Sequence, residues 1–310
     1  MTTIAIIGTG VVGERIINQA LGLEEYEIVA VFDEQQDRLA QIVEKYQVPA
    51  VTSMEELLAL RADWIYVGTP PISHASLTEQ IASRRLNVLS EKPLAHDYEQ
   101  GEKMVGAIER YNVQSAMHFP MMYSPEVRYL KNALAAGELG DVLRIELHTH
   151  FPVWPRPWQQ NPWIATKEQG GFIREIFPHY LQLTHHLFGD LGILSHETMY
   201  QEDPTLCEVS VSALAKTHSG IPLLLNGASN MAQKERIEYK IFGSKKTMII
   251  RNWSELLECT VEDDLRIVEV FEENENLLQA CANYLNGKEA LIIPFDEGLK
   301  VQKWIEELLQ

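Results

Sequence analysis

The chain has 310 residues, 45% of them hydrophobic, which is enough for one large or two medium domains with buried cores. Its 26 basic and 44 acidic residues give a formal net charge of −18, which repels nucleic-acid backbones and anionic membranes, so neither is an expected partner. No apolar run approaches the ~20 residues of a membrane span, and no basic region precedes the first apolar run, so we expect a soluble, unexported protein. The three cysteines, Cys207, Cys259 and Cys281, form no CxxC and favour a reducing cytoplasm over a disulfide framework or a metal site.

Short β-branched runs alternate with amphipathic segments over residues 1–119. The runs predicted to be strands are TIAIIG, EIVAVFD, DWIYVGT, NVLSEK and VQSAMHF. Helices are predicted between and after them, at about 12–22, 34–46, 54–60, 73–84 and 97–111. Strands that are apolar on both faces and separated by helices indicate a doubly wound parallel sheet, so we assign 1–119 to a Rossmann domain.

The pattern changes in residues 120–310, which we assign to a second domain. A helix at about 124–136, a strand at about 141–151 and a helix over 170–188 precede several alternating runs between 192 and 271. The chain closes with helices near 273–286 and 295–309. This order predicts an α+β domain with an open, mostly antiparallel sheet that binds substrate and mediates oligomerisation.

A glycine-rich turn follows the first predicted strand. Gly8, Gly10 and Gly13 allow a tight turn, a close approach of a pyrophosphate and close packing of the next helix. Asp33 ends the next strand and can accept hydrogen bonds from both ribose hydroxyls, which favours NAD over NADP, although Arg38 could partly offset the carboxylate. The intervening residues of the predicted cofactor loop are Thr9, Val11 and Val12.

The stretch SEKPLA places Glu91 and Lys92 where a buried strand leaves the sheet. A lysine drawn out of water there would give up its proton more readily than an exposed one. The alternative is that the two side chains form a solvated pair at a strand end.

Several stretches together resemble the glucose-fructose oxidoreductase, inositol dehydrogenase and MocA family, written Gfo/Idh/MocA. They are YVGTPPISHASL, SEKPLA, GELGDVLRIEL, GGFIREIFPHYLQLTHHLFG and RIEYKIFGSKKTMII. The resemblance implies that Lys92 lies beside the nicotinamide, that the Lys92–Pro93 bond is cis, and that the C-terminal sheet forms a homodimer or homotetramer. It further implies that the cofactor contacts include Thr69, Pro70, His74 and Glu91.

The family's DxGxH motif corresponds here to EIFPH, which places Glu175 at the acidic position and His179 at the histidine. Four residues separate them, so one helical face can present both. Pro178 predicts a kink or a helix start. Gln182 and Met122 replace polar family residues, make the site less polar and put the usual sugar substrate in doubt.

The loop FPVWPRPWQQNPW is the remaining candidate substrate contact. Arg156 could bind a carboxylate or phosphate, and Trp158 and Trp163 either wall a substrate pocket or pack the loop. The histidines show no HExxH or matching carboxylate spacing, so we expect no metal.

We interpret the chain as an NAD-dependent oxidoreductase, with NADP as a possible cofactor, that moves a hydride to or from the CH–OH carbon of a small polyol, sugar, cyclitol or related diol. Lys92 and His179 are then predicted to meet across one cleft, with side-chain nitrogens within about 8 Å, and Glu175 orients the pair. The alternatives are a non-catalytic NAD(P) sensor of the same fold and a lyase, glycosidase or epimerase that retains NAD.

Overall fold

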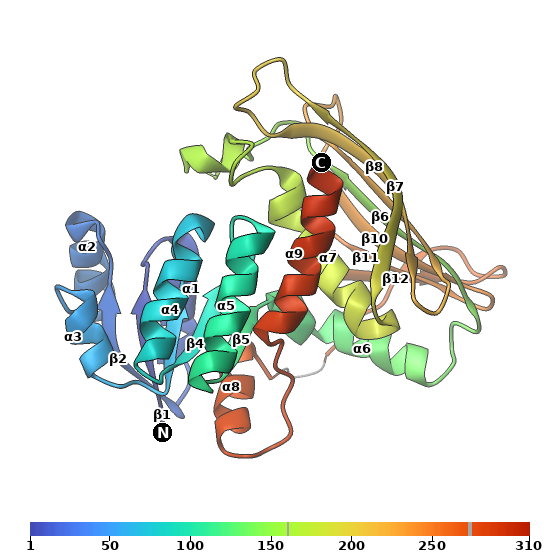
Figure 1. The fold of residues 1–310 in the computed structure, drawn as a ribbon. Coiled ribbons are helices and arrows are strands. Elements are labelled where there is room, and N and C mark those ends of the chain that lie inside the picture. Colours follow the sequence, from blue (N-terminus) through green and yellow to red (C-terminus); the bar gives the residue numbers. More distant parts are fainter. Residues whose placement is uncertain (160, 272–274) are drawn as a thin grey trace. The chain divides into compact units, whose positions relative to one another are not determined.

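A computed structural model describes residues 1–159, 161–271 and 275–310 (Figure 1). The chain divides into one unit formed by Met1–Phe119 and Glu275–Gln302 and another formed by Pro120–Asn274 and Lys303–Gln310. The sequence assigns all of 120–310 to one domain, and the return of Glu275–Gln302 to the first unit corrects that division.

The first unit is built on a five-stranded parallel sheet with strand order β2-β1-β3-β4-β5. Its strands are β1 (Thr2–Ile7), β2 (Tyr26–Phe32), β3 (Trp64–Val67), β4 (Asn87–Glu91) and β5 (Ser115–His118). Every residue of β3 and β5 is buried, as expected for strands covered on both faces. The predicted doubly wound Rossmann sheet is confirmed.

Helices follow the strands of this sheet as the hydrophobic periodicity predicts. They are α1 (Val11–Leu21), α2 (Gln36–Tyr46), α3 (Met54–Ala59), α4 (His74–Ser83) and α5 (Tyr98–Tyr111). The C-terminal segment adds α8 (Leu277–Leu285) and α9 (Phe295–Leu309), whose residues after Gln302 belong to the second unit. Side-chain caps fix three of the starts, because Ser53 accepts from Glu56 N, Asp97 from Gln100 N and Asn276 from Gln279 N. Residues 273 and 274 of the predicted helix at 273–286 lie outside the described residues.

Backbone hydrogen bonds explain why the C-terminal segment joins the first unit. Met117 N donates to Ile293 O at 2.8 Å, and Phe295 N donates to Ser115 Oγ at 3.1 Å. The buried Tyr26 hydroxyl donates to Leu278 O at 2.6 Å. The first two bonds satisfy polar groups of the edge strand β5, and the third satisfies the hydroxyl of Tyr26 on the opposite edge strand β2. No local sequence pattern reveals these long-range bonds.

The second unit contains an eight-stranded sheet with order β13-β12-β11-β10-β6-β9-β8-β7. Its strands are β6 (Val142–His150), β7 (Leu191–Tyr200), β8 (Glu208–Thr217), β9 (Pro222–Ala228), β10 (Arg236–Gly243), β11 (Thr247–Arg251), β12 (Glu255–Cys259) and β13 (Arg266–Ile267). Only the β6–β9 pair is parallel among these neighbours. The prediction of a mostly antiparallel sheet is therefore confirmed.

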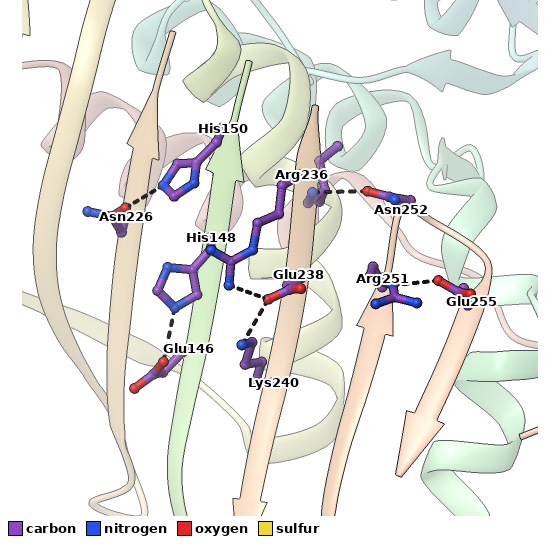
Figure 2. Close-up of polar contacts among 11 residues, drawn as sticks. Glu146, His148, His150, Asn226, Arg236, Glu238, Lys240, Arg251, Asn252 and Glu255 are labelled. Carbon is purple, nitrogen blue, oxygen red and sulfur yellow. Dashed lines mark hydrogen bonds and ion pairs between the residues drawn. The ribbon is translucent and has the colours of Figure 1, made fainter. Parts of the chain in front are cut away.

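The two faces of this sheet differ in polarity. One face is apolar and packs on α7 (Phe172–Phe188), where Tyr180 stacks on Tyr239 with ring centroids 5.6 Å apart and Thr184 Oγ1 lies 2.9 Å from the Tyr239 hydroxyl. The opposite face carries a polar network, shown in Figure 2, that includes Glu146, His148, His150, Asn226, Arg236, Glu238 and Lys240. Strand alternation places the two sets on opposite faces. The remaining helix, α6 (Pro125–Ala135), begins at a Ser124 cap.

The helix α7 begins at Phe172, so the predicted helix start at Pro178 is wrong. Proline removes one helical donor, which costs about 3 kcal/mol in an isolated helix. Here every residue from Phe172 to Thr184 except Glu175 is buried, and this tertiary packing offsets the lost bond.

Glu208, the first residue of β8, holds the N-terminus of α7. Its Oε1 accepts a 2.7 Å hydrogen bond from Ile173 N, while Oε2 has no hydrogen-bond partner among the described residues. A side chain at Gly171, whose φ is +96°, would place its Cβ 2.2 Å from that oxygen. Burial raises the pKa of Glu208 to about 7, although the Ile173 N–H lowers it in part.

Within the described ranges, no helix is both long and apolar enough to span a membrane.

The raised pKa predicts how Glu208 affects stability. The folded carboxyl keeps its proton up to about pH 7 whereas the unfolded one loses it near pH 4.5, so the free energy of unfolding falls as the pH rises between these values. Glu208→Gln should therefore be more stable than the parent by roughly 1–3 kcal/mol at about pH 8 and show little difference at about pH 4.5 in urea unfolding. Glu197→Gln, an exposed residue of β7, is the control, and a Glu208→Gln variant less stable at about pH 8 would contradict the assignment.

Candidate functional site

The glycine turn lies between β1 and α1, as the motif predicts. Gly8 has φ +87°, and a Cβ on Gly13 would lie only 1.9 Å from Gly8 O, so these positions require glycine. A Cβ on Gly10 would lie 3.3 Å from Arg38 Nη1, which places the guanidinium beside the turn. Val11 and Val12 form the first turn of α1, whose free N–H groups suit an anion.

Asp33 closes the turn from the end of β2. Its Oδ2 accepts from Thr9 N at 2.8 Å and from Thr9 Oγ1 at 2.9 Å, and its Oδ1 accepts from Gln35 N at 2.9 Å. The buried carboxylate therefore rigidifies the loop and retains lone pairs for a ribose. The glycine cradle and this acceptor fit a dinucleotide, with Gly8, Gly10 and Gly13 opposite the phosphates and Asp33 toward the ribose.

His74 connects the two loops that follow β3 and β4. Its Nε2 lies 2.9 Å from Thr69 O and its Nδ1 lies 3.1 Å from Leu94 O. Burial lowers the pKa of this fully buried imidazole, although the same carbonyls oppose the effect. With both ring nitrogens engaged by backbone, His74 shapes the predicted cofactor loop at Thr69 and Pro70 from behind.

Lys92 follows β4, and the predicted cis Lys92–Pro93 bond is confirmed. The adjacent Glu91 carboxylate accepts from Tyr66 OH at 2.6 Å and contacts His118 Nδ1, while Lys92 N donates to its second oxygen at 3.3 Å. Tyr66, Glu91 and His118 come from the neighbouring strands β3, β4 and β5. The carboxylate is thus held inside the sheet by side chains, which the expectation of a cofactor contact at Glu91 did not include.

The electrostatics of Glu91 follow from this network. Burial alone would raise the pKa of Glu91, but the charge of His118 and the hydrogen bonds from His118 and Tyr66 lower it to about 2. Burial and the carboxylate in turn raise the pKa of Tyr66 well above its usual range. Tyr66 therefore remains a neutral donor, and Glu91 remains ionised at neutral pH.

In the second unit, Glu175 and His179 lie one helical turn apart on α7. The His179 ring is nearly buried and meets Trp253 edge-on, with centroids 5.2 Å apart and an interplanar angle of 90°. The same indole lies 5.7 Å from the ring of Tyr180. Trp253, in the turn between β11 and β12, is a site residue that the sequence analysis missed; an aromatic in the short turn RNWSE is the signal that could have found it.

The remaining predicted substrate residues have different environments. Arg156 is buried and lies over the rings of Trp158 and Trp253, with Cζ 5.7 and 5.9 Å from their centroids. Trp163 lies in a 3-10 helix, Pro162–Ala165, and its carbonyl accepts from Thr166. Met122 and Gln182 are both buried, Met122 in a 3-10 helix, Pro120–Tyr123, and Gln182 within α7. Arg156, Trp158, Trp253 and His179 are therefore linked through ring contacts, whereas Lys92 belongs to the first unit.

The chain combines a Rossmann sheet, whose glycine turn is closed by Asp33, with a second, open sheet. This combination is typical of nicotinamide-dependent oxidoreductases. Residues 2–119 match the oxidoreductase family with an NAD-binding Rossmann fold, and residues 127–249 match the GFO/IDH/MocA C-terminal domain. The chain belongs to the Gfo/Idh/MocA family, which confirms the resemblance.

Individual relatives are more distant. Glucose-6-phosphate 3-dehydrogenase of Bacillus subtilis is 28% identical over 192 residues, which cover 61% of this chain and 54% of the relative. 2,7-Anhydro-N-acetylneuraminate hydratase of Escherichia coli is 24% identical over 192 residues, which cover 62% of this chain and 50% of the relative. The chain thus matches about half the length of these curated relatives.

Among solved structures, the WlbA dehydrogenase from Bordetella pertussis in complex with NADH and UDP-GlcNAcA is similar, with a TM-score of 0.83. Its sequence identity is 19%, over 99% of this chain and 94% of the other. At this identity the likeness establishes a shared fold.

The partnership of His118 with Glu91 predicts a large stability effect. His118→Ala leaves a buried, ionised carboxylate with one side-chain donor fewer, and should lower the free energy of unfolding by about 3–5 kcal/mol at neutral pH. Urea unfolding measures this, with the exposed His196→Ala as control. Adding Glu91→Gln to His118→Ala should restore part of the loss, because it removes the unpaired charge, and a further loss would refute the charge pairing.

Proposed function

We propose that the chain is an NAD(P)-dependent dehydrogenase that transfers a hydride to or from a hydroxyl-bearing carbon of a small polyol, sugar, cyclitol or related diol. The supporting observation is the phosphate turn that Asp33 closes on Thr9, in a chain of an oxidoreductase family that also carries Lys92 at the end of β4. A glycine turn alone would fit any nucleotide. The Asp33 carboxylate and Lys92 favour a nicotinamide dinucleotide used in a redox reaction.

The chain's own residues divide the acid–base work. His179 takes the proton of the substrate hydroxyl, Lys92 stabilises the developing alkoxide, and Glu175 orients the pair. When bound, the nicotinamide supplies the hydride acceptor or donor. The expectation that Lys92 and His179 reach the same oxygen stays a prediction, as does the choice between them as the base.

The names of the relatives support a sugar or sugar derivative as substrate, since one is a glucose-6-phosphate dehydrogenase and another a hydratase of an anhydro sugar acid. Hydration involves no net oxidation or reduction, so the name of the hydratase also supports the alternative of a reaction that retains NAD throughout. A sensor without turnover is the other alternative.

Self-association through the eight-stranded sheet is part of the proposal. The polar network of Figure 2 extends across the face opposite α7, and Met199 and Leu214 on the same face are 56% and 50% exposed. A mixed polar and apolar face of this kind suits a homodimer or homotetramer. The three cysteines are free, which fits the proposed cytoplasmic location.

The cofactor preference is predicted from Asp33. Its carboxylate repels a 2′-phosphate, so NADH should bind more tightly than NADPH in a fluorescence titration. Asp33→Ser should narrow the difference, and Arg38→Ser should weaken NADPH further, because Arg38 is the cation beside the turn. Equal or reversed affinities in the parent protein would overturn the preference.

Turnover tests the acid–base roles. Lys92→Ala and His179→Ala should each lower kcat by roughly 10² to 10⁴ while leaving NADH affinity nearly unchanged, because these groups act on the transition state. If both act on one oxygen, the double variant should lose little more than either single one. NADH absorbance over a panel of polyols, sugars and cyclic diols measures this.

Lys103→Ala, which breaks an exposed ion pair with Glu99, and His196→Ala are matched controls. Normal turnover in either the Lys92 or the His179 variant would remove that residue from the mechanism. A parent protein that binds NADH but oxidises nothing in the panel would favour the sensor, and NAD that remains bound through purification would favour the NAD-retaining reaction.

A further inference from the structure

We propose that Arg156 and Trp253 form a recognition subsite for an anionic group with two or more oxygens, a carboxylate or a phosphate, carried by the substrate. The inference deepens the proposed function and rests on it for the identity of the ligand as substrate.

The environment of Arg156 is the first observation. The residue is only 8% exposed, and its guanidinium carbon lies 5.1, 5.7, 5.7 and 5.9 Å from the ring centroids of Phe151, Trp154, Trp158 and Trp253. Such contacts stabilise the faces of a guanidinium but provide no acceptors for its N–H groups.

The hydrogen-bonding state of Arg156 is the second observation. Within the described part of the chain, its buried Nε and Nη2 make no hydrogen bond, and its ion pair runs from Nε to Glu235 Oε1 at 3.4 Å. The equally buried Arg174 also has an Nε without a hydrogen bond among the described residues, but its Nη1 donates to Lys167 O at 2.9 Å and its Nη2 pairs with Glu306. Unmade donors on a buried cation cost free energy, and a carboxylate or phosphate would satisfy the guanidinium edge with two parallel bonds.

Trp253 connects this cation to the proposed base. Its indole contacts the guanidinium of Arg156 and also the ring of His179. The backbone at Trp253 has φ +81°, a strained conformation for a residue with a side chain, and costs about 1–3 kcal/mol. Asn252 holds the turn, because its N donates to Ile237 O at 2.9 Å and its Oδ1 accepts from Ile237 N at 3.1 Å (Figure 2).

This geometry places the anion subsite and the proton acceptor against the same indole. A substrate whose charged group binds Arg156 would therefore present a hydroxyl a few atoms away to His179. The strained turn is explained if it positions that indole for recognition.

The charged groups around Arg156 determine whether an anion can approach its guanidinium. Burial lowers the pKa of the guanidinium, while Glu235, Glu175 and Tyr180 oppose that effect. Burial raises the pKa of Tyr180 far above neutrality, so the negative neighbours are the two glutamates. The Glu235 side chain is 39% exposed and its contact exceeds hydrogen-bond length, so an incoming anion can displace it.

The test is calorimetric titration of the NADH-loaded protein with four ligands that share one ring: glucose, glucuronamide, glucuronate and glucose 6-phosphate. Glucuronate and glucuronamide differ in charge at constant shape, and glucose 6-phosphate distinguishes a phosphate from a carboxylate. At least one acid should bind about tenfold or more tightly than both neutral ligands.

Variants then assign the effect to the subsite. Arg156→Gln should abolish the preference for the acid, whereas Glu235→Gln should strengthen acid binding about threefold or more because a competing carboxylate is removed. Arg110→Gln is the matched control, since Arg110 also pairs with a glutamate and lies over an aromatic ring but is exposed. If Arg156→Gln does not fold, the comparison of acidic and neutral ligands in the parent protein and in Glu235→Gln still tests the subsite.

Binding of all four ligands with equal affinity by the parent, or an acid preference that survives Arg156→Gln, would overturn the inference. Oxidation of neutral polyols unaffected by Arg156→Gln would leave the proposed function standing without the subsite. Acid binding that depends on Arg156, without turnover on any ligand, would leave the subsite standing and reject the dehydrogenase.

Discussion

Removing a charge from water costs free energy that only a well-placed partner offsets, and three buried ionic groups of this chain meet that constraint differently. Glu91 is held by two side chains and one backbone N–H and stays ionised. Glu208 has one backbone donor and takes up a proton near neutral pH. Arg156 makes a long ion pair with Glu235 and contacts four aromatic rings. The less completely the protein itself satisfies the charge, the stronger the case that another molecule does.

The parts that the sequence predicts well are those in which a local requirement has one chemical solution. Only glycine fits at Gly8 and Gly13, where the backbone leaves no room for a Cβ, and the sequence therefore predicts the turn. The position of the Asp33 carboxylate is predictable because a fixed spacing from the turn brings it to the end of the next parallel strand. Hydrophobic periodicity locates most helices of the first unit, because each helix buries one apolar face.

The parts that the sequence does not predict depend on long-range pairing. Tyr66 and His118 look like ordinary buried strand residues until the strand order places both beside Glu91. Trp253 meets Arg156 and His179 only because a hairpin turn approaches α7. The helix start predicted at Pro178 is wrong because the local propensity of proline does not reflect the packing that surrounds α7.

The one parallel pair in the eight-stranded sheet, β6 with β9, has a consequence for how that sheet is assembled. The strands β7, β8 and β9 are neighbours in both sequence and space, as are β10 to β13, so each set can form by local hairpins. The strand β6 precedes both sets in the chain and lies between them, so the two ribbons become one sheet only when β6 enters the middle. Formation of this seam therefore also completes the sheet face on which α7, the helix of Glu175 and His179, packs through Tyr180 and Tyr239.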